Sequence, residues 1–191
     1  MGIKIIEDVD FEKIDFKNNE IKEGEYENCC FNNCDFSNAD FSNFKFSNCE
    51  FTSCNLSLVK LNKTVFRSIK FKGCKMLGLN FKDCNEFGIS FYFENCQLNH
   101  SSFYQMKIKK TIFKNSQLQE VDFTECDLTS SVFENCELTR ALFEYTNIEK
   151  ADLRTALNYS IDPEINKIKR AKFSINGLAG LLYKYNIEIE N

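Results

Sequence analysis

Large hydrophobic residues recur at every fifth position along most of the chain. A first run of these positions extends from Phe11 to Phe81, and a second, two residues out of phase, extends from Phe93 to Leu153. A period of five fits neither the 3.6-residue period of an α-helix nor the two-residue period of a β-strand. The pattern therefore predicts an array of short, similar structural units.

Each five-residue unit is predicted to form one straight edge and one corner. If the large hydrophobic residue is called position i, then positions i−2 and i face inward in an extended segment and i−1 faces outward. Positions i+1 and i+2 are rich in Ser, Asn, Thr, Lys and Gly, as in Phe36-Ser-Asn and Phe41-Ser-Asn. These residue types favour tight turns, so the chain is expected to change direction once per unit.

Four units resemble the consensus of the pentapeptide-repeat family, Ala-(Asp/Asn)-(Leu/Phe)-X-X. They start at Cys34, Ala39, Cys126 and Ala151, and read Cys-Asp-Phe-Ser-Asn, Ala-Asp-Phe-Ser-Asn, Cys-Asp-Leu-Thr-Ser and Ala-Asp-Leu-Arg-Thr. The resemblance covers roughly residues 6 to 156. It implies an all-β fold, a right-handed quadrilateral parallel β-helix with four units per coil.

A twenty-residue spacing supports four units per coil independently. The positions spaced in this way from the first Phe are themselves all Phe: Phe11, Phe31, Phe51, Phe71, Phe93, Phe113 and Phe133. The column stays uniform only if residues 84–92 contain a two-residue insertion. About seven coils result, with a bulge at residues 85–88 that expels Glu86 because burying an unpaired carboxylate is costly, and with Phe87 filling the core position. The bulge is either a local irregularity or a recognition loop.

The chain divides into a β-helix, residues 1–156, and a C-terminal segment, residues 157–191. Ser174 is a suitable N-cap for a short capping α-helix, whose apolar residues lie at helical spacing: Leu178, Leu181, Leu182 and Tyr185. The ending resembles the C-terminal cap of pentapeptide-repeat proteins, which in the Qnr and MfpA branch also forms a dimer. The helix could cover the last coil, form a homodimer interface, or do both.

The ten cysteines follow the five-residue pattern. Nine of them occupy position i−2, which predicts that they are buried as small hydrophobic residues, and only Cys30 falls at an outward position. Cys34, Cys54, Cys74 and Cys96 are expected to stack in one column. No metal site or disulfide is expected from them.

Composition and motifs argue against catalysis. The chain has one histidine, His100, at an outward corner position, and no phosphate-binding glycine loop or catalytic triad. The Phe-rich interior leaves no room for a pocket, so we expect no enzymatic activity and no cofactor. The first residues show no secretory or myristoylation signal, and no long apolar stretch predicts a membrane segment. These features favour a cytoplasmic protein.

Charge is banded along the chain. Residues 1–27 hold nine acidic and four basic residues, residues 56–82 hold seven basic and no acidic ones, and residues 119–152 hold nine acidic and two basic ones. The candidate acidic surface comprises Asp122, Glu125, Asp127, Glu134, Glu137, Glu144, Glu149 and Asp152. The candidate basic band comprises Arg67, Lys70, Lys72, Lys107, Lys109, Lys110 and Lys114.

Three functions remain open at this point. The resemblance to Qnr and MfpA implies a rod that mimics DNA, binds DNA gyrase or topoisomerase IV and protects it from quinolones. The basic band departs from that pattern, since it would repel a basic DNA-binding surface. A general protein-binding scaffold is the alternative, and nucleic-acid binding through the basic band ranks last, so no direct DNA binding is expected.

Overall fold

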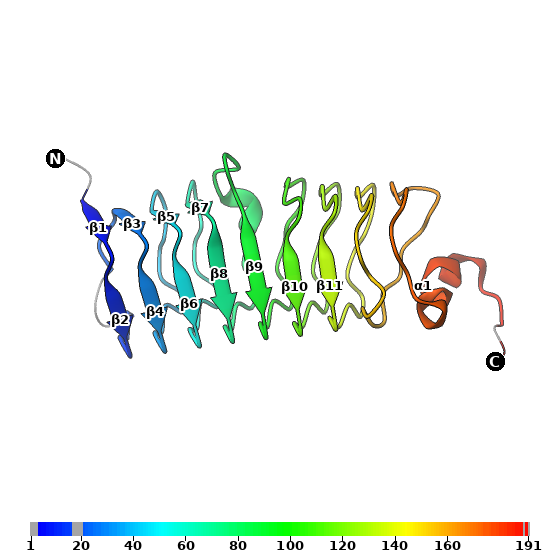
Figure 1. The fold of residues 1–191 in the computed structure, drawn as a ribbon, viewed down its shortest axis with the longest axis horizontal. Helices are drawn as coiled ribbons and strands as arrows, with labels where there is room; N and C mark the ends of the chain where they lie inside the picture. The colour runs from blue at the N-terminus through cyan, green and yellow to red at the C-terminus, as the bar shows by residue number, and fades with distance from the viewer. Residues whose placement is uncertain (1–3, 17–20, 189, 191) are drawn as a thin grey trace.

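The computed structural model describes residues 4–16, 21–188 and 190, and shows a parallel β-solenoid with a short helical segment at its C-terminal end (Figure 1). The predicted β-helix is confirmed. The strands are β1 (Ile5–Glu7), β2 (Asp10–Glu12), β3 (Glu25–Glu27), β4 (Cys30–Asn32), β5 (Lys45–Ser47), β6 (Glu50–Thr52), β7 (Val65–Arg67), β8 (Ile69–Lys72), β9 (Phe91–Glu94), β10 (Ile112–Lys114) and β11 (Val132–Glu134). The helical turns are η1 (Phe81–Asp83), η2 (Ile175–Gly177), α1 (Ala179–Leu182) and η3 (Tyr183–Tyr185).

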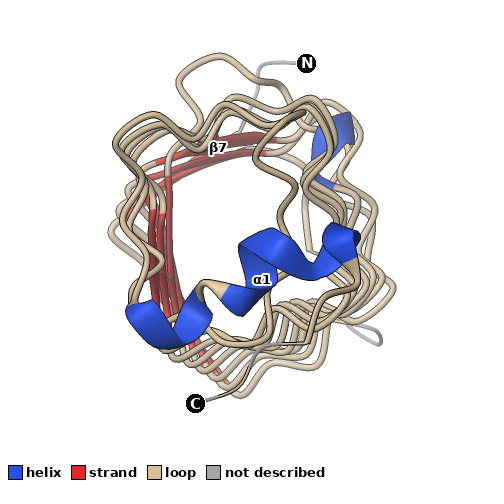
Figure 2. Cartoon of the chain, turned by 90° about the vertical axis from the view of Figure 1, so that its right-hand side faces the viewer, coloured by secondary structure: helices blue, strands red, loops and turns tan. Residues whose placement is uncertain are grey.

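The rod has four sides, which we number in chain order (Figure 2). Face 1 carries the four-stranded sheet β1-β3-β5-β7, and face 2 carries a seven-stranded sheet in the order β2-β4-β6-β8-β9-β10-β11. On faces 3 and 4, successive coils pair through isolated parallel bridges, such as Gln97↔Gln117 on face 3 and Ser102↔Asp122 on face 4. The parallel pairing of face 2 continues beyond β11 through the isolated bridges Val132↔Asp152 and Asp152↔Lys172.

Aromatic stacks fill the interior. On face 2, the Phe31 and Phe51 rings stack with centroids 4.6 Å apart, and those of Phe93 and Phe113 lie 5.1 Å apart. Rings from the opposite faces 2 and 4 meet edge to face, as Phe113 and Phe103 do at 6.0 Å. Both geometries are favourable for aromatic pairs, so the predicted Phe column is the centre of the core.

The corners need a left-handed backbone once per unit. Position i+2 has a φ near +60° in nearly every described repeat, as at Asn38 (61°), Asn43 (66°) and Lys150 (59°). This conformation costs free energy for residues other than Gly, Asn and Asp, which explains the many Asn residues there. An Asp at i−1 accepts a hydrogen bond from the backbone N–H at i+1, as Asp122 does from Thr124 at 2.9 Å.

The i−2 position does more than bury a small side chain. The Cys54 thiol donates to the Phe31 carbonyl of the preceding coil at 3.2 Å, and the Thr64 hydroxyl donates to the Phe41 carbonyl at 2.7 Å. Cys and Thr at this position therefore donate a hydrogen bond to a backbone carbonyl as well as filling space in the core. All nine cysteines at i−2 are buried, and Cys30 is half-buried.

The insertion lies on face 1, where a loop projects from the rod between β8 and β9 (Figure 1). Glu86 is exposed, as predicted. The prediction that Phe87 fills the core is wrong, because 78% of Phe87 is exposed, above the guanidinium of Arg67. Phe91 occupies the core instead, with its ring 5.7 Å from that of Phe66 and 5.5 Å from that of Phe81.

Coil pairing continues into the segment that the sequence assigned to the cap, through the bridges Asn147↔Lys167 and Asp152↔Lys172. Ser174 caps the helical segment as predicted, by accepting a hydrogen bond from the Gly177 N–H at 3.2 Å. The α-helical part is a single turn between two 3₁₀ turns. The segment crosses the end of the rod (Figure 2).

Candidate functional site

The outer faces of the rod are the candidate site, because the interior is closed by stacked side chains. Within a coil, faces 1 to 4 follow one another in steps of five residues, so side chains twenty residues apart share a face. The eight predicted acidic residues consequently spread over all four faces: Asp127 and Glu149 on face 1, Glu134 and Asp152 on face 2, Glu137 on face 3, and Asp122, Glu125 and Glu144 on face 4. The acidic band surrounds the rod and does not form one surface.

Two of these carboxylates have cationic partners among the described residues. Asp152 accepts hydrogen bonds from the Arg154 guanidinium at 2.7 and 2.9 Å, and Asp127 lies 3.1 Å from the Lys109 ammonium. The hydrogen bond from Arg154 lowers the pKa of the Asp152 carboxyl. Their charge is largely compensated locally, so Asp127 and Asp152 offer less to a cationic partner.

Of the eight predicted acidic residues, the three on face 4 make no ion pair with any described residue. Glu125 accepts hydrogen bonds from Gln105 at 2.9 Å and Tyr104 at 3.4 Å, and Asp122 accepts one from the Ser102 hydroxyl at 3.3 Å. Glu144 is exposed. We call Asp122, Glu125 and Glu144 the face 4 acidic cluster, because their negative charge is uncompensated and shared by two successive coils.

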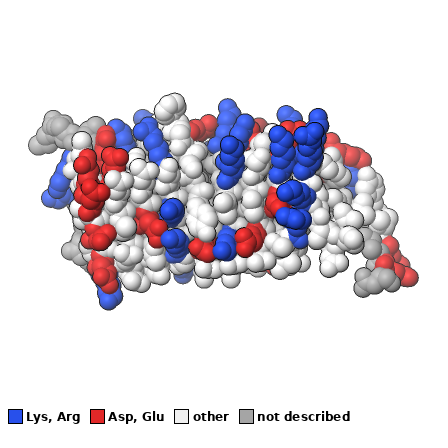
Figure 3. Space-filling model, viewed as in Figure 1, with Lys and Arg blue, Asp and Glu red and all other residues white. Residues whose placement is uncertain are grey.

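The predicted basic band also divides between faces. Lys72 and Lys114 lie on face 2, where they pair with Glu50 at 2.8 Å and Glu94 at 3.3 Å. Lys70 is on the same face, and Arg67 lies on face 1 beside the insertion. Lys107, Lys109 and Lys110 lie on face 1 and at its corner with face 2. Figure 3 shows positive and negative side chains intermixed on face 2.

Sequence reasoning missed four further cations that lie near Lys107, Lys109 and Lys110. The ladder Lys107↔Asp127↔Asn147↔Lys167 puts Lys167 on face 1, and Lys150, Lys169 and Arg170 follow at adjoining positions. Basic side chains accordingly gather along the upper edge of the C-terminal half of the rod in Figure 3. The twenty-residue spacing from Lys110 through Lys150 to Arg170 is the signal that could have found them.

The predicted cap residues differ in their surroundings. Leu181 packs against the core, whereas Leu178, Leu182 and Tyr185 are 45%, 36% and 50% exposed. Neighbouring apolar side chains are exposed as well, among them Ile175, Tyr183 and Ile187. The helical segment therefore covers the last coil through Leu181 and leaves an apolar outer side.

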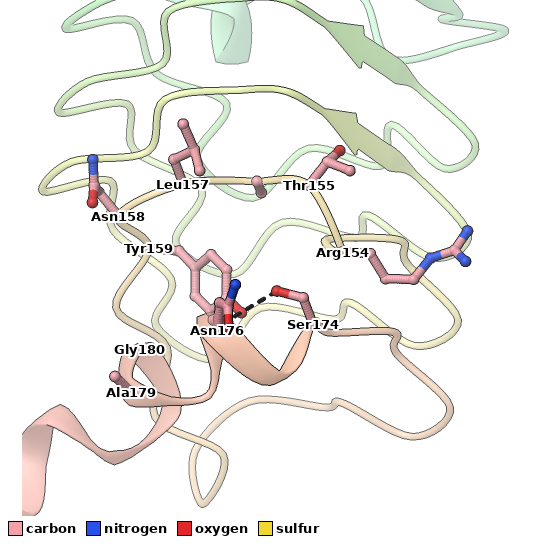
Figure 4. A pocket seen from close by; sticks show the side chains of 11 residues that line it. Arg154, Thr155, Leu157, Asn158, Tyr159, Ser174, Asn176, Ala179 and Gly180 are labelled. Atoms are coloured by element: carbon pink, nitrogen blue, oxygen red, sulfur yellow. Dashed lines mark hydrogen bonds between the residues drawn. The ribbon is translucent and has the colours of Figure 1, made fainter. Parts of the chain in front are cut away.

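A hollow lies between the last coil and the cap, lined by residues that include Arg154, Tyr159 and Asn176 (Figure 4). Tyr159 is buried, its hydroxyl makes no hydrogen bond with any described residue, and burial raises the pKa of that hydroxyl. Within the described residues, no group of three or more His, Cys, Asp or Glu side chains could hold a metal ion. None of the described helices has the length and apolar character to cross a membrane.

Comparison with known proteins identifies the family. The model described as "Pentapeptide repeat region" matches residues 24–92 and 89–155. The chain belongs to the pentapeptide-repeat family. A comparison with curated proteins finds no match.

Solved structures share the fold over nearly the whole chain. A trypsin-treated form of QnrB1, a plasmid-mediated fluoroquinolone resistance protein, is 19% identical with a TM-score of 0.65, covering 97% of this chain and 99% of that chain. HetL, a pentapeptide-repeat protein involved in heterocyst differentiation regulation from the cyanobacterium Nostoc, is 11% identical with a TM-score of 0.68. The match covers 91% of this chain and 87% of HetL. At these identities the likeness shows a common fold.

Proposed function

We propose that this chain is a non-enzymatic, cytoplasmic protein-binding rod that binds a type II topoisomerase and protects it from quinolones. The observation that carries the proposal is the end-to-end likeness to QnrB1, which covers 98% of this chain and 100% of the other at a TM-score of 0.64. A match over both full lengths includes the C-terminal segment as well as the coils.

The face 4 acidic cluster is the surface we assign to this contact. A basic DNA-binding surface attracts carboxylates that are not already paired, since an internal ion pair weakens the field outside the protein. Chain order puts Asp162 and Glu164 in the next coil of the same face, although both pair with Lys184, at 2.7 and 2.6 Å. The acidic surface therefore has its free charge at Asp122, Glu125 and Glu144.

The test is a gyrase supercoiling assay with ciprofloxacin. We expect the wild-type protein to restore supercoiling at or below equimolar concentration. The variant Asp122→Asn, Glu125→Gln, Glu144→Gln should lose the protection, and Asn at position 122 keeps an oxygen for the Thr124 N–H. Absence of protection by the wild-type protein would contradict the proposal.

A matched control separates the cluster from total charge. The variant Asp152→Asn, Glu134→Gln, Glu137→Gln removes the same three charges by the same chemical changes on faces 2 and 3. It should protect as the wild-type protein does. Equal losses in both variants would show that face 4 is not the contact.

The exposed apolar side of the cap favours a homodimer through this segment. Exposed apolar patches often mark protein contacts, and Leu178, Leu182 and Tyr185 contribute to one here. Sedimentation of the wild-type protein should give a dimer, and Leu178→Ser with Leu182→Ser should give a monomer. If the wild-type protein is a monomer, the C-terminal segment covers the last coil and does not form a dimer interface.

A general scaffold is the second candidate, supported by the likeness to HetL, whose described role concerns regulation of differentiation. A scaffold with another partner would give no protection in the gyrase assay. The intermixed charges of face 2 suit such a role, because they favour solubility over a strong field of one sign.

A further inference from the structure

We propose that the corner between faces 1 and 2, in the C-terminal half of the rod, binds the phosphate backbone of duplex nucleic acid. We call this surface the basic edge; it comprises Lys107, Lys109, Lys110, Lys150, Lys167, Lys169 and Arg170. The expectation of no direct DNA binding rested on the band from Arg67 to Lys114. The coils place only part of that band here and add four cations from later in the chain.

Backbone pairing fixes the arrangement of the basic edge. The Lys150 N–H donates to the Lys169 carbonyl at 3.0 Å, the Ile148 N–H donates to the Lys167 carbonyl at 2.9 Å, and the Lys110 N–H donates to the Thr129 carbonyl at 3.0 Å. Lys110, Lys150 and Arg170 share the left-handed corner conformation, with φ of 60°, 59° and 60°. They therefore line one corner over three coil steps, about 14 Å at the usual strand spacing.

The cations of the basic edge are mostly uncompensated. Lys109 lies 3.1 Å from Asp127, but the other six make no ion pair within the described part of the chain, and all six are exposed. The outward positions of face 1, i−1, i+1 and i+2, contain one other acidic residue between Lys107 and Arg170, which is Glu149. On face 2, by contrast, Lys72 and Lys114 each have a carboxylate partner.

Like charges stack on adjacent coils of the edge, with Lys150 next to Arg170. Neighbouring like charges repel each other, and the fold does not require them, because Asn and Ser occupy the same corner in other coils, at Asn48 and Ser130. An anion bound along the edge would offset the repulsion. A shallow hollow lined by Glu149, Lys150, Lys169 and Arg170 lies on this edge.

The chemistry of the edge favours a duplex over other polyanions. Between Lys107 and Arg170, the outward positions of face 1 (i−1, i+1 and i+2) are occupied by Lys, Arg, Asp, Asn, Thr, Glu and Ser. None of these positions holds an aromatic side chain on which an unpaired base could stack. Contact through phosphates alone carries no sequence preference. A duplex presents one charge per about 1.7 Å of axis, a density that several closely spaced cations can use.

The test is fluorescence anisotropy with a fluorescein-labelled 20-base-pair DNA duplex at 50, 100 and 200 mM KCl. We expect the wild-type protein to bind at 50 mM KCl and its Kd to rise more than about tenfold by 200 mM, because each neutralised phosphate releases counterions. The variant Lys110→Asn, Lys150→Asn, Arg170→Asn should bind at least tenfold more weakly, with the slope of log Kd against log salt reduced by about 2 to 3. Asn suits the left-handed corner and removes the repulsion between like charges, so this variant should melt at or above the wild-type temperature.

The matched control is Lys13→Asn, Lys63→Asn, Arg140→Asn. These two lysines and one arginine also have a positive φ, of 52°, 58° and 56°, but lie at the other corners. This control should bind within twofold of the wild-type protein. Equal losses in both variants, or no salt-dependent binding by the wild-type protein, would overturn the proposal. So would tighter binding of a polyglutamate peptide that displaces the duplex, because the partner would then be an acidic protein segment.

Discussion

The rings of Phe71 and Phe93 lie parallel, with centroids 5.4 Å apart and planes 9° apart, across a coil that is two residues longer than its neighbours. Strand pairing shows the same register, with Phe71 opposite Phe93 and Ile69 opposite Phe91. The additional residues are therefore accommodated on face 1, and the aromatic column of face 2 continues without a break.

Replacing a ring of this column should be costly, whereas replacing the aromatic residue of the insertion should not. Phe93→Ala should lower the free energy of unfolding by about 3–5 kcal/mol, as expected for truncating a fully buried Phe. Phe87→Ala should change it by less than about 0.5 kcal/mol, because the side chain is mostly exposed. Urea denaturation measures both. Similar midpoints for the two variants would contradict a continuous column.

The corner conformation predicts a stabilising substitution. Leu58 has a φ of 59° and is 59% exposed, so it has the strain of the left-handed region with little burial in return. Leu58→Asn should raise the free energy of unfolding by roughly 0.5–1 kcal/mol, since Asn tolerates this conformation better. Asn48→Leu, at the equivalent position of another corner, should lower it by a similar amount. A lower free energy of unfolding for Leu58→Asn, or a higher one for Asn48→Leu, would refute this account.

The cap depends on a close approach between Gly180 and Tyr159. A Cβ at position 180 would lie 2.3 Å from the Tyr159 carbonyl oxygen and 2.8 Å from its ring, and the Gly180 carbonyl accepts a hydrogen bond from the Ile161 N–H at 2.9 Å. Gly180→Ala should loosen the cap and speed tryptic cleavage after Lys184. Ala179→Ser, at the exposed neighbouring position, is the control and should cleave at the wild-type rate.

Thiol accessibility checks the inward register of the cysteines. In the native protein Cys30 should be the one cysteine that reacts with an alkylating reagent within minutes, and denaturant should expose all ten. Burial raises the pKa of the Cys49 and Cys136 thiols to about 12, which further suppresses their reaction because the thiolate is the nucleophile. Mass spectrometry counts the labels. Fast labelling of several i−2 cysteines would mean that the coils open.

Acid should weaken the cap through Lys184. Its hydrogen bonds lower the pKa of the Asp162 and Glu164 carboxyls in the folded protein. Their contribution to stability is thus complete above the unfolded pKa values, about 3.9 and 4.3, and is lost as the pH falls through the lowered folded values. The difference in melting temperature between wild type and Lys184→Met should be largest above about pH 5 and shrink below pH 4.

The control for this pH dependence is Lys150→Met, which removes an exposed cation with no ion pair within the described residues. Its difference from the wild-type protein should stay nearly constant from pH 6 to pH 3. A Lys184→Met difference that also stayed constant would show that Asp162 and Glu164 do not carry the effect.

Particular residues show how far sequence reasoning reached. The five-residue period correctly predicted the buried Phe columns, the inward cysteines and the exposure of Glu86. The prediction failed at Phe87 because the five-residue period assumes that every coil has the same length. In the longer coil, the Phe91 ring of the following strand fills the core position that the period assigns to Phe87. The acidic residues between Asp122 and Asp152 were grouped by closeness in the chain, but each step of five residues turns the next side chain onto another face.

The sequence by itself determined the inside of this protein. A large hydrophobic residue at every fifth position can be buried only if the chain turns once per unit, because burying apolar surface is the dominant favourable contribution to folding. The tertiary structure decided the outside. Whether two charged side chains share a surface depends on the length of each coil and on where the insertion is accommodated, so Lys110, Lys150 and Arg170 become neighbours only when the coils stack.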